Sequence, residues 1–419
     1  MTRRDPGVRA LRREHRTRRH LLGSDTTRIY VAQGLRAAAY GFGAVLLSTS
    51  LSDRGFSRWQ VGLILGSILA GTALMSIFVG RFADRFGRRR TYAALYLLLA
   101  LTGVSFALVS SPWILALTGL TGSLSTEVIE SGPFTSLEQA MIASEAGTRT
   151  RTRNFGRYNA VAAACGSLGA LGAGLAQLLQ ARPSVHGASP MLFLLFVPIA
   201  LGGSGVALSL SDAAEPRAVL GPLGRLHQSK SVVQRLASLF ALDSFAGGLT
   251  ISVFVGYWLH TRFLASTAAI GTLFFLLGVF QTFSFLAATS LARRFGLLRT
   301  MVFSHLPSNL LVVAVAFAPN LKFAIAILVA RASLSQMDVP TRQAYVMTLV
   351  SPDERTPAAA YTNSARYVTR PFGPPVASAL SQVSLGLPFV VAGSIKVVYD
   401  LTLWGWFRRV PLPEELEAT

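Results

Sequence analysis

Long apolar runs are the feature of this sequence that most limits how it can fold. A helix that spans a membrane needs about 20 mostly apolar residues, and runs of this kind recur along the chain between short polar segments. We expect spans at 29–50, 60–80, 91–110, 112–132, 156–180, 190–210, 234–259, 266–289, 300–318, 321–341, 356–381 and 386–407. Only 14% of the residues are charged, against roughly 25% in soluble domains. The sequence therefore predicts an all-α membrane protein with twelve transmembrane helices.

The spans fall into two sets of six, separated by a polar connector that contains proline and glycine. This predicts five segments: a basic tail at 1–28, a six-helix bundle at 29–210, a linker at 211–232, a second six-helix bundle at 233–408 and a tail at 409–419. Residues 1–28 are rich in arginine and have no apolar core, so they do not form a signal peptide. We expect a disordered tail that touches anionic lipid, with an organellar targeting segment as the alternative.

The basic residues show how the chain is oriented. A net charge of +20 could indicate a nucleic-acid binder, but the lysines and arginines cluster between apolar runs. If both termini are cytoplasmic, only five of the 39 basic residues lie outside: Arg54, Arg58, Arg182, Arg262 and Lys322. Cytoplasmic loops carry the excess of Lys and Arg. We therefore expect a multi-pass protein of the cytoplasmic membrane with both termini inside, in contact with membrane lipid and with no nucleic-acid partner.

One polar turn, from Gly80 to Arg90, has a distinctive spacing. It reads Gly-Arg-Phe-Ala-Asp-Arg-Phe-Gly-Arg-Arg-Arg, with Asp84 alone among five arginines. Part of it recurs 209 residues later, where Arg294-Phe295-Gly296 repeats Arg85-Phe86-Gly87. Arg293 replaces Asp84 in the second copy, so the duplicated turn keeps its carboxylate only once.

This turn resembles the signature loop of the major facilitator superfamily, between helices two and three. The match covers Gly80, Asp84, Arg85, Gly87, Arg88 and Arg89. The resemblance implies two pseudo-symmetric six-helix bundles around a central cavity that opens alternately to each side. Two further stretches, Glu130–Gln139 and Met337–Gln343, resemble a branch of bacterial facilitators often described as efflux proteins. The helix-four arginine and helix-five proline of drug/proton antiporters are absent here.

Charged residues within the spans are candidates for proton coupling or for the substrate cavity, because each costs about 2.5–3.5 kcal/mol to insert at the membrane centre. These candidates are Arg36, Glu127, Glu130, Asp243, Arg331, Asp338, Arg366 and Arg370. Arg36 and Asp243 lie at equivalent depths in helices one and seven, so we predict that they pair, either during coupling or as a static ion pair. A structural role is an alternative for each of the other candidates. We expect Lys396 to pair with Asp400, four residues later, and Glu138 to be cytoplasmic and structural.

The start of helix eleven offers a partner for the signature turn. Ser351-Pro352-Asp353-Glu354 has the pattern of a helix N-terminus, where the helix dipole favours an anion such as Asp84. Arg85 or Arg88 could then meet Asp353 or Glu354 when the cytoplasmic side closes. The predicted conformational gate comprises Gly80, Asp84, Arg85, Gly87, Arg88, Asp353 and Glu354.

Together these features predict a secondary active transporter that works by alternating access. We expect proton-coupled efflux of a small molecule by a monomeric antiporter. Proton-linked uptake or facilitated diffusion of a polar or anionic metabolite is the alternative, and a non-transporting sensor or scaffold is the alternative of another class. The sequence has no phosphate-binding loop, no recognisable catalytic group and one cysteine, Cys165. We therefore expect no enzymatic activity, cofactor or metal.

Overall fold

The computed structural model describes residues 6–127, 132–143, 148–179, 189–215, 226, 229–350 and 354–409, and within these ranges the chain forms helices and no β-strand. The first half contains α1 (Pro6–Asp53), α2 (Arg58–Phe86), α3 (Arg88–Leu108), α4 (Pro112–Gly119), α5 (Pro133–Ala143), α6 (Thr148–Leu178), η1 (Pro190–Leu195), α7 (Phe196–Leu208) and η2 (Asp212–Ala214). The second half contains α8 (Lys230–Leu249), α9 (Ser252–Phe263), α10 (Thr267–Phe295), α11 (Leu297–Val315), α12 (Leu321–Ser335), α13 (Asp338–Leu349), α14 (Arg355–Thr369), η4 (Arg370–Phe372), α15 (Gly373–Val383) and α16 (Leu387–Phe407). The predicted all-α fold is confirmed.

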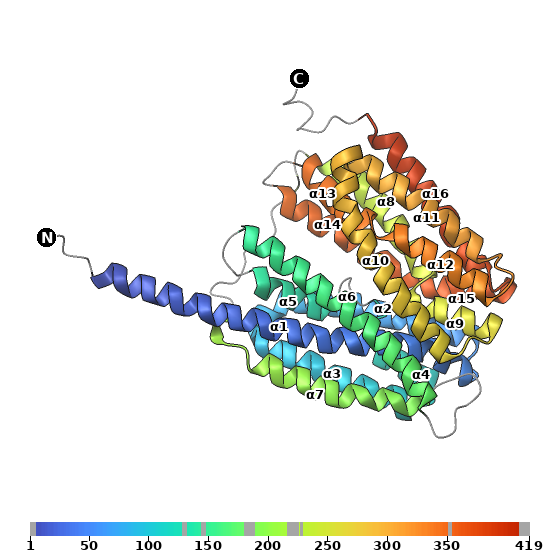
Figure 1. Ribbon diagram of the computed structural model, residues 1–419, viewed down its shortest axis with the longest axis horizontal. Helices are drawn as coiled ribbons and strands as arrows, with labels where there is room; N and C mark the ends of the chain where they lie inside the picture. Colours follow the sequence, from blue (N-terminus) through green and yellow to red (C-terminus); the bar gives the residue numbers. More distant parts are fainter. Residues whose placement is uncertain are drawn as a thin grey trace.

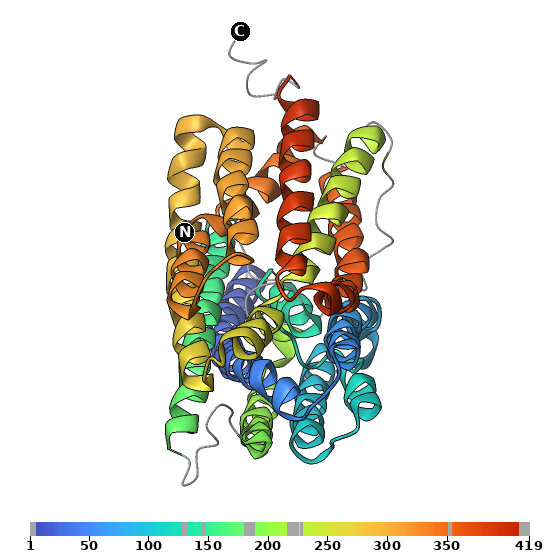
Figure 2. The same ribbon diagram turned by 90° about the vertical axis from the view of Figure 1, so that its right-hand side faces the viewer.

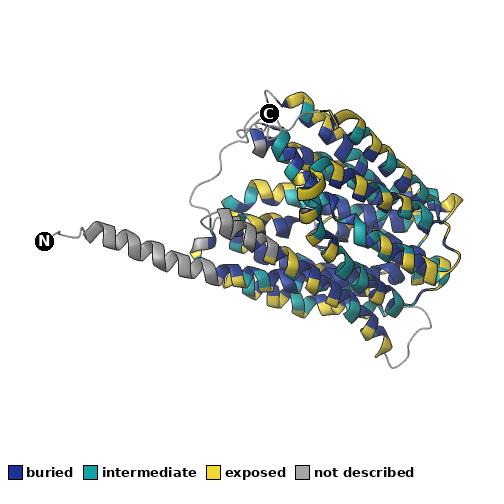
Figure 3. Cartoon of the chain, turned by 45° about the horizontal axis from the view of Figure 1, so that its top comes forward, coloured by how far each residue is buried: buried dark blue, intermediate teal, exposed yellow. Residues whose placement is uncertain are grey.

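The outer surface of the molecule is suited to lipid. In the described part of the chain, nine helical stretches are long and apolar enough to cross a membrane. Large apolar side chains are exposed on many helices, among them Leu117, Phe283 and Phe317, while the buried residues lie inside (Figure 3). Soluble proteins rarely expose so many apolar groups together. The remaining predicted spans fall on α1, on α4 with the segment after it, and on α14 and α15, so the total of twelve stays a prediction.

Four predicted spans are interrupted, which corrects the expectation of continuous helices. Within the span predicted at 112–132, α4 ends at Gly119, the described residues 120–127 are not helical, and the next described helix begins at Pro133. Gly122 explains the break: its φ is +68°, and a Cβ there would lie 2.3 Å from the carbonyl oxygen of Gly71. The other interruptions lie between α8 and α9, between α12 and α13, and at η4 between α14 and α15. Irregular backbone at membrane depth is tolerated where it is buried in protein or lines a cavity.

The basic N-terminal segment is also different from the prediction. Residues from Pro6 onward belong to α1, which runs without interruption to Asp53, so this part of the expected disordered tail is helical. Arginine and leucine, which favour helices, are the most frequent residues from Pro6 to Ser24. At its inner end the Asp25 carboxylate accepts hydrogen bonds from the backbone N–H and hydroxyl of Ser211, at 3.1 and 2.5 Å, which fastens α1 to the segment after α7.

The two halves of the chain pack as neighbouring groups of helices (Figures 1 and 2). Within the first half α1 packs on α6 and α3 packs on α7, while in the second half α8 packs on α14 and α11 on α16. The halves meet where α2 contacts α15, α6 contacts α10 and α1 contacts α9.

Polar contacts between the halves gather at one end of the helices. His260 lies 3.0 Å from Asp53, Thr267 donates to the hydroxyl of Thr49 over 3.3 Å, and the Arg58 guanidinium bonds the carbonyl oxygen of Ser381. The Gly80–Arg90 turn lies at the opposite end of α2. The halves are therefore fastened together at the end away from the signature turn.

Glycine allows the first and sixth helices to approach closely. A Cβ at Gly169 would lie 2.0 Å from the carbonyl oxygen of Ala38, and one at Gly41 would lie 1.9 Å from that of Gly166. Such distances are far below van der Waals contact, so even a methyl group would force α1 and α6 apart.

We therefore expect Gly169→Ala to lower the free energy of unfolding by about 1–3 kcal/mol, as overpacking does, and to lower the midpoint of thermal unfolding in detergent. Gly205→Ala in α7 is the matched control, because nothing lies within 4 Å of a Cβ there. Alanine is favoured over glycine in a helix by about 1 kcal/mol, so the control should be neutral or stabilising. Equal midpoints for the two variants would contradict this account of the interface.

Candidate functional site

A central cavity of about 220 Å³ lies between the two halves. A single water needs roughly 10–15 Å³ by a similar measure, so the cavity has room for on the order of 15 water-sized atoms. The interrupted helices supply much of its lining: Thr126 and Glu127 after α4, Thr250 and Ser252 where α8 ends and α9 begins, Ser335, Gln336 and Asp338 where α12 ends and α13 begins, and Arg370 at η4. The breaks thus place polar backbone and side chains against the cavity, where water or a ligand can satisfy them.

The two walls of the cavity have different chemistry. The first half contributes small side chains from α1 and α6, namely Gly41, Ala44, Ala163, Gly166, Ser167 and Ala170. Glu127 is the one charged lining residue from the described part of this half. The second half contributes all the other charged lining residues. As far as the described residues show, one wall therefore consists of small residues with little charge, and the other is strongly ionic.

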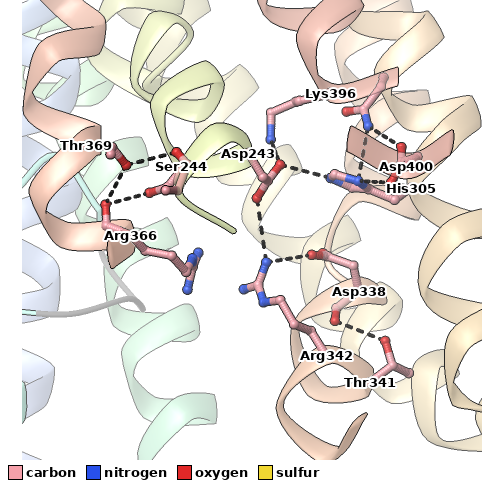
Figure 4. A network of polar contacts seen from close by, with 12 residues as sticks. Asp243, Ser244, His305, Asp338, Thr341, Arg342, Arg366, Thr369, Lys396 and Asp400 are labelled. Atoms are coloured by element: carbon pink, nitrogen blue, oxygen red, sulfur yellow. Dashed lines mark hydrogen bonds and ion pairs between the residues drawn. The ribbon is translucent and has the colours of Figure 1, made fainter. Parts of the chain in front are cut away.

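Asp243, on α8, is the centre of the ionic wall (Figure 4). Its carboxylate is buried, and one oxygen lies 2.5 Å from Nζ of Lys396 on α16. The other oxygen lies 3.6 Å from the guanidinium of Arg342, which also bonds Asp338 one turn earlier on α13, at 3.0 Å. Because a buried carboxylate is costly without a cationic partner, this cluster holds α8, α13 and α16 in register.

His305, on α11, lies between two carboxylates. Its Nε2 is 3.9 Å from Asp243 and its Nδ1 is 2.9 Å from Asp400 (Figure 4). The side-chain amide of Asn309 donates to the second oxygen of Asp400 over 2.8 Å. An imidazole in this position can accept a proton on one nitrogen and release one from the other. His305 therefore connects the cavity-lining Asp243 with the fully buried Asp400.

An ion pair between described residues of the two halves crosses the cavity. The Arg370 guanidinium of η4 lies 2.6 Å from the carboxylate of Glu127 in the segment after α4. Both side chains are partly exposed, at 17% and 26%. This contact joins the helix breaks of the two halves, so a change in their separation would break it.

The predicted pair between Arg36 and Asp243 is wrong for this structure. Arg36 instead lies 2.7 Å from Glu138 of α5, and both residues are buried in the first half. Glu138 also accepts hydrogen bonds from the hydroxyls of Tyr92, at 2.6 Å, and Tyr158. The helical break after α4 makes this possible, because it lets α5 return into the bundle and bring Glu138 to α1. Glu138 is therefore a buried partner of Arg36, in agreement with the structural role predicted for it.

The predicted pairing of Lys396 with Asp400 is also wrong. Although they are four residues apart, Lys396 extends to Asp243 while Asp400 bonds His305 and Asn309. Lys396 and Asp400 each have hydrogen-bonding partners on other helices, namely Asp243 for Lys396 and His305 with Asn309 for Asp400. These partners replace the ion pair within α16.

The other predicted cavity residues divide into three groups. Glu127, Asp243, Arg331, Asp338, Arg366 and Arg370 all line the cavity. Arg36 does not, and Glu130 lies outside the described residues. The sequence reasoning missed His305, and it missed Arg342 because the predicted span ended one residue before it. The signals were present: a histidine within the apolar run at 300–318 and an arginine four residues after Asp338.

The signature turn is held by contacts within the first half. Gly87 separates α2 from α3 with a φ of +90°, a value that favours glycine. The carboxylate of Asp84 accepts from the side-chain Nε of Arg88 over 2.7 Å. Glu215 accepts from the backbone N–H groups of Arg88 and Arg89, at 2.7 and 3.1 Å, so it caps the N-terminus of α3.

The expected docking of this turn on helix eleven is not among the described contacts. The carboxylate of Glu354 accepts from the backbone N–H of Ser229, at 2.9 Å, and Asp353 lies outside the described residues. Gly80 has open space around it, and the Arg85 guanidinium lies over the ring of Phe82. In this conformation the two halves contact each other at the opposite end of α2, through pairs such as Asp53 with His260. Contacts of the predicted gate residues between the halves are therefore not required.

Removing the Arg36–Glu138 pair one charge at a time should show that it is structural. We expect Glu138→Gln to lower the free energy of unfolding by about 3–5 kcal/mol, since it leaves a buried guanidinium without its counter-charge. The double variant Arg36→Met with Glu138→Gln should be less destabilised, because no buried charge remains while the tyrosine hydroxyls keep an acceptor. Thermal unfolding in detergent is measured for the wild type, for each single variant (Glu138→Gln and Arg36→Met) and for the double variant. Additive losses in the double-mutant cycle would contradict the pairing.

A family model and several solved structures of membrane transporters agree on the family of this chain. The sequence model of the Major Facilitator Superfamily matches residues 29–237. The uncharacterised membrane protein YJR124C of Saccharomyces cerevisiae is 26% identical over 92% of this chain and 94% of its own length. Among solved structures, the nucleoside transporter NupG has a TM-score of 0.71 at 14% identity, covering 92% of this chain and 99% of that one. The xylose transporter XylE from E. coli has a TM-score of 0.69 at 17% identity, covering 95% and 99%.

At these identities the solved structures establish the fold and not the cargo. The fold agrees with the signature turn and with the family match across the first half. The chain therefore belongs to the major facilitator superfamily, a family of membrane transporters and not of enzymes.

Proposed function

We propose that this transporter is a secondary active antiporter of the cytoplasmic membrane that exports a small molecule in exchange for protons. The observation that carries the proposal is the ionic wall of the central cavity. Asp243 lines the cavity and is connected through His305 to Asp400. Ionisable groups within membrane spans are costly, and they commonly mark ion pathways and proton relays.

In the proposed coupling, a proton competes with the basic side chains of this wall for the carboxylate of Asp243. Asp243 has three cationic or basic neighbours, Lys396, Arg342 and His305. A proton that neutralises Asp243 weakens its hold on Lys396 and Arg342, and these then turn toward a substrate or another carboxylate. Proton binding and substrate binding at the same cavity are in this way linked through shared partners.

Alternating access is supported by the distribution of contacts between the halves. They gather around Asp53, Thr49 and Arg58, at the end that the basic-residue pattern assigns to the outside. We assign this conformation to the state closed on the outer side. When the cytoplasmic side closes, the signature turn would meet Asp353 and Glu354, which precede α14. Its contacting residues would be Asp84, Arg85, Gly87 and Arg88. Exposed ion pairs contribute about 0–1 kcal/mol each, so such a gate biases the equilibrium without locking it.

Proteoliposomes that contain a pH-sensitive dye in the lumen test the function and its direction. When a transported compound is added outside, an antiporter should make the lumen more alkaline, because substrate enters as protons leave. Acidification would instead identify proton-linked uptake, and substrate entry without a pH change would identify facilitated diffusion. If no compound of a chemically broad panel moves, the non-transporting sensor or scaffold replaces the proposal.

Asp243→Asn should separate coupling from binding. Because the amide cannot take up a proton in the relevant pH range but keeps the shape of the carboxyl, we expect the variant to retain exchange of labelled for unlabelled substrate. It should lose accumulation driven by a pH gradient by tenfold or more. The two assays on the same vesicles provide the control for folding, and unchanged gradient-driven accumulation would exclude Asp243 from coupling.

A disulfide across the outer contact should stop the cycle. In a Cys165→Ala background, we expect Thr49→Cys with Thr267→Cys to cross-link on oxidation, because the two hydroxyls lie 3.3 Å apart. Oxidation should abolish transport and reductant should restore it. Thr102→Cys with Ser123→Cys is the matched control, since these hydroxyls are 2.8 Å apart within one half. Full transport by the oxidised Thr49–Thr267 pair would contradict alternating access.

A further inference from the structure

We infer that the cargo is an amphiphilic organic anion, and that its anionic group is bound by Arg331. This inference rests on the proposed function and gives the same cavity a substrate class. It follows from the charge balance of the cavity, from the contacts of Arg331 and from the chemistry of the opposite wall.

The cavity has more cations than carboxylates. Its lining contains five basic side chains with a permanent positive charge: Arg331, Arg342, Arg366, Arg370 and Lys396. The carboxylates among the described lining residues number three: Glu127, Asp243 and Asp338. Arg36 and Asp400 are buried away from this surface and cancel each other, whereas Arg342 adds a cation to the lining and Glu130 lies outside the described residues. The described lining is thus left with an excess of two positive charges.

The three carboxylates are already bonded to other cations. Glu127 pairs with Arg370, Asp243 with Lys396, and Asp338 with Arg342, at 2.6, 2.5 and 3.0 Å. In each case the partner lies within direct hydrogen-bonding distance. These three contacts leave Arg331 without a carboxylate at hydrogen-bonding distance among the described residues.

Arg331 carries part of this excess. It lies near the end of α12, seven residues before Asp338, and it lines the cavity. Among the described residues none forms a hydrogen bond or ion pair with its guanidinium, and its Nε is buried without a partner. An unpaired guanidinium at membrane depth is costly, and an oxyanion can satisfy it with two parallel hydrogen bonds.

The opposite wall indicates what the rest of the cargo is like. The first half presents a surface of small, uncharged residues, which are Gly41, Ala44, Ala163 and Ala170. Phe274 and Leu277 extend this surface on α10. A compact apolar group can lie against this surface without displacing a charge. An anionic group at Arg331 and an apolar group at α1 and α6 would together bridge the two halves.

A second cavity, of about 460 Å³, adjoins the first at Arg342 and Arg366, which line both. It is lined by residues of α13 and α14 and by Phe240 of α8. The junction between the two spaces is thus basic, so it favours passage of an anion toward Arg331 over passage of a cation.

Three probes with one ring and different permanent charges test the inference: benzenesulfonate, benzenesulfonamide and phenyltrimethylammonium. We expect benzenesulfonate to raise the unfolding temperature of the purified wild type at constant ionic strength, and the neutral and cationic probes to leave it unchanged. In Arg331→Gln the concentration for half-maximal stabilisation should rise roughly ten- to a hundredfold, as for loss of a charged hydrogen bond. Arg331→Lys, which keeps the charge but not the planar fork, should lie between.

Arg235→Gln is the matched control, because it removes one exposed arginine from α8 outside the cavity, and it should respond like the wild type. Equal stabilisation by all three probes, an unchanged response in Arg331→Gln, or no response of the wild type to benzenesulfonate would each overturn the inference. Should Arg331→Gln fail to fold, a wild-type affinity in Arg331→Lys would overturn the role of bidentate binding.

The dye-loaded proteoliposomes separate this inference from the proposed function. Benzenesulfonate that binds in an Arg331-dependent way without any flux would support the anion site and contradict transport of this probe class by proton exchange. Proton flux elicited by benzenesulfonamide or phenyltrimethylammonium, and not by benzenesulfonate, would support transport and overturn the anion site.

Discussion

Polar groups inside a membrane must find partners within the protein, and this requirement explains where the chain departs from simple spanning helices. Backbone that leaves the helical hydrogen-bonding pattern exposes N–H and C=O groups that lipid cannot satisfy. The interruptions after α4, between α8 and α9, between α12 and α13, and at η4 all lie at the central cavity. Discontinuous helices at the midplane are typical of transporter binding sites, and here they determine where the charged residues gather.

The same requirement divides the buried charges into two kinds. In the first half, Arg36 and Glu138 are enclosed with Tyr92 and Tyr158 and do not line the cavity. In the second half, Asp243 and its partners line it. A buried pair that is enclosed by tyrosine hydroxyls fixes the packing of α1 on α5, whereas a pair at a cavity can exchange its partners when a proton or ligand arrives. The difference assigns the two halves unequal roles despite their repeated sequence pattern.

The signature turn shows how a family motif is stabilised in one conformation. Gly87 provides the backbone geometry, Arg88 neutralises Asp84, and Glu215 from the segment after α7 caps α3. The carboxylate that binds this helix N-terminus thus comes from the same half. Contacts of this kind keep the turn ordered while the two halves are joined at the far end by Asp53 with His260 and Arg58 with Ser381.

The sequence by itself determined the fold class, because runs of apolar residues long enough to span a membrane leave helices as the solution, and the Gly80–Arg90 spacing identified the family. It also located most of the charged cavity residues, since a charge within an apolar run is conspicuous. Only the tertiary structure decided which charges meet. Arg36 pairs with Glu138 because the chain breaks at Gly122 and α5 returns into the bundle. Lys396 pairs with Asp243 on another helix, although Asp400 is nearer in sequence. Sequence spacing describes neighbours on one helix, whereas ion pairs form between whichever buried groups the packing brings within hydrogen-bonding distance.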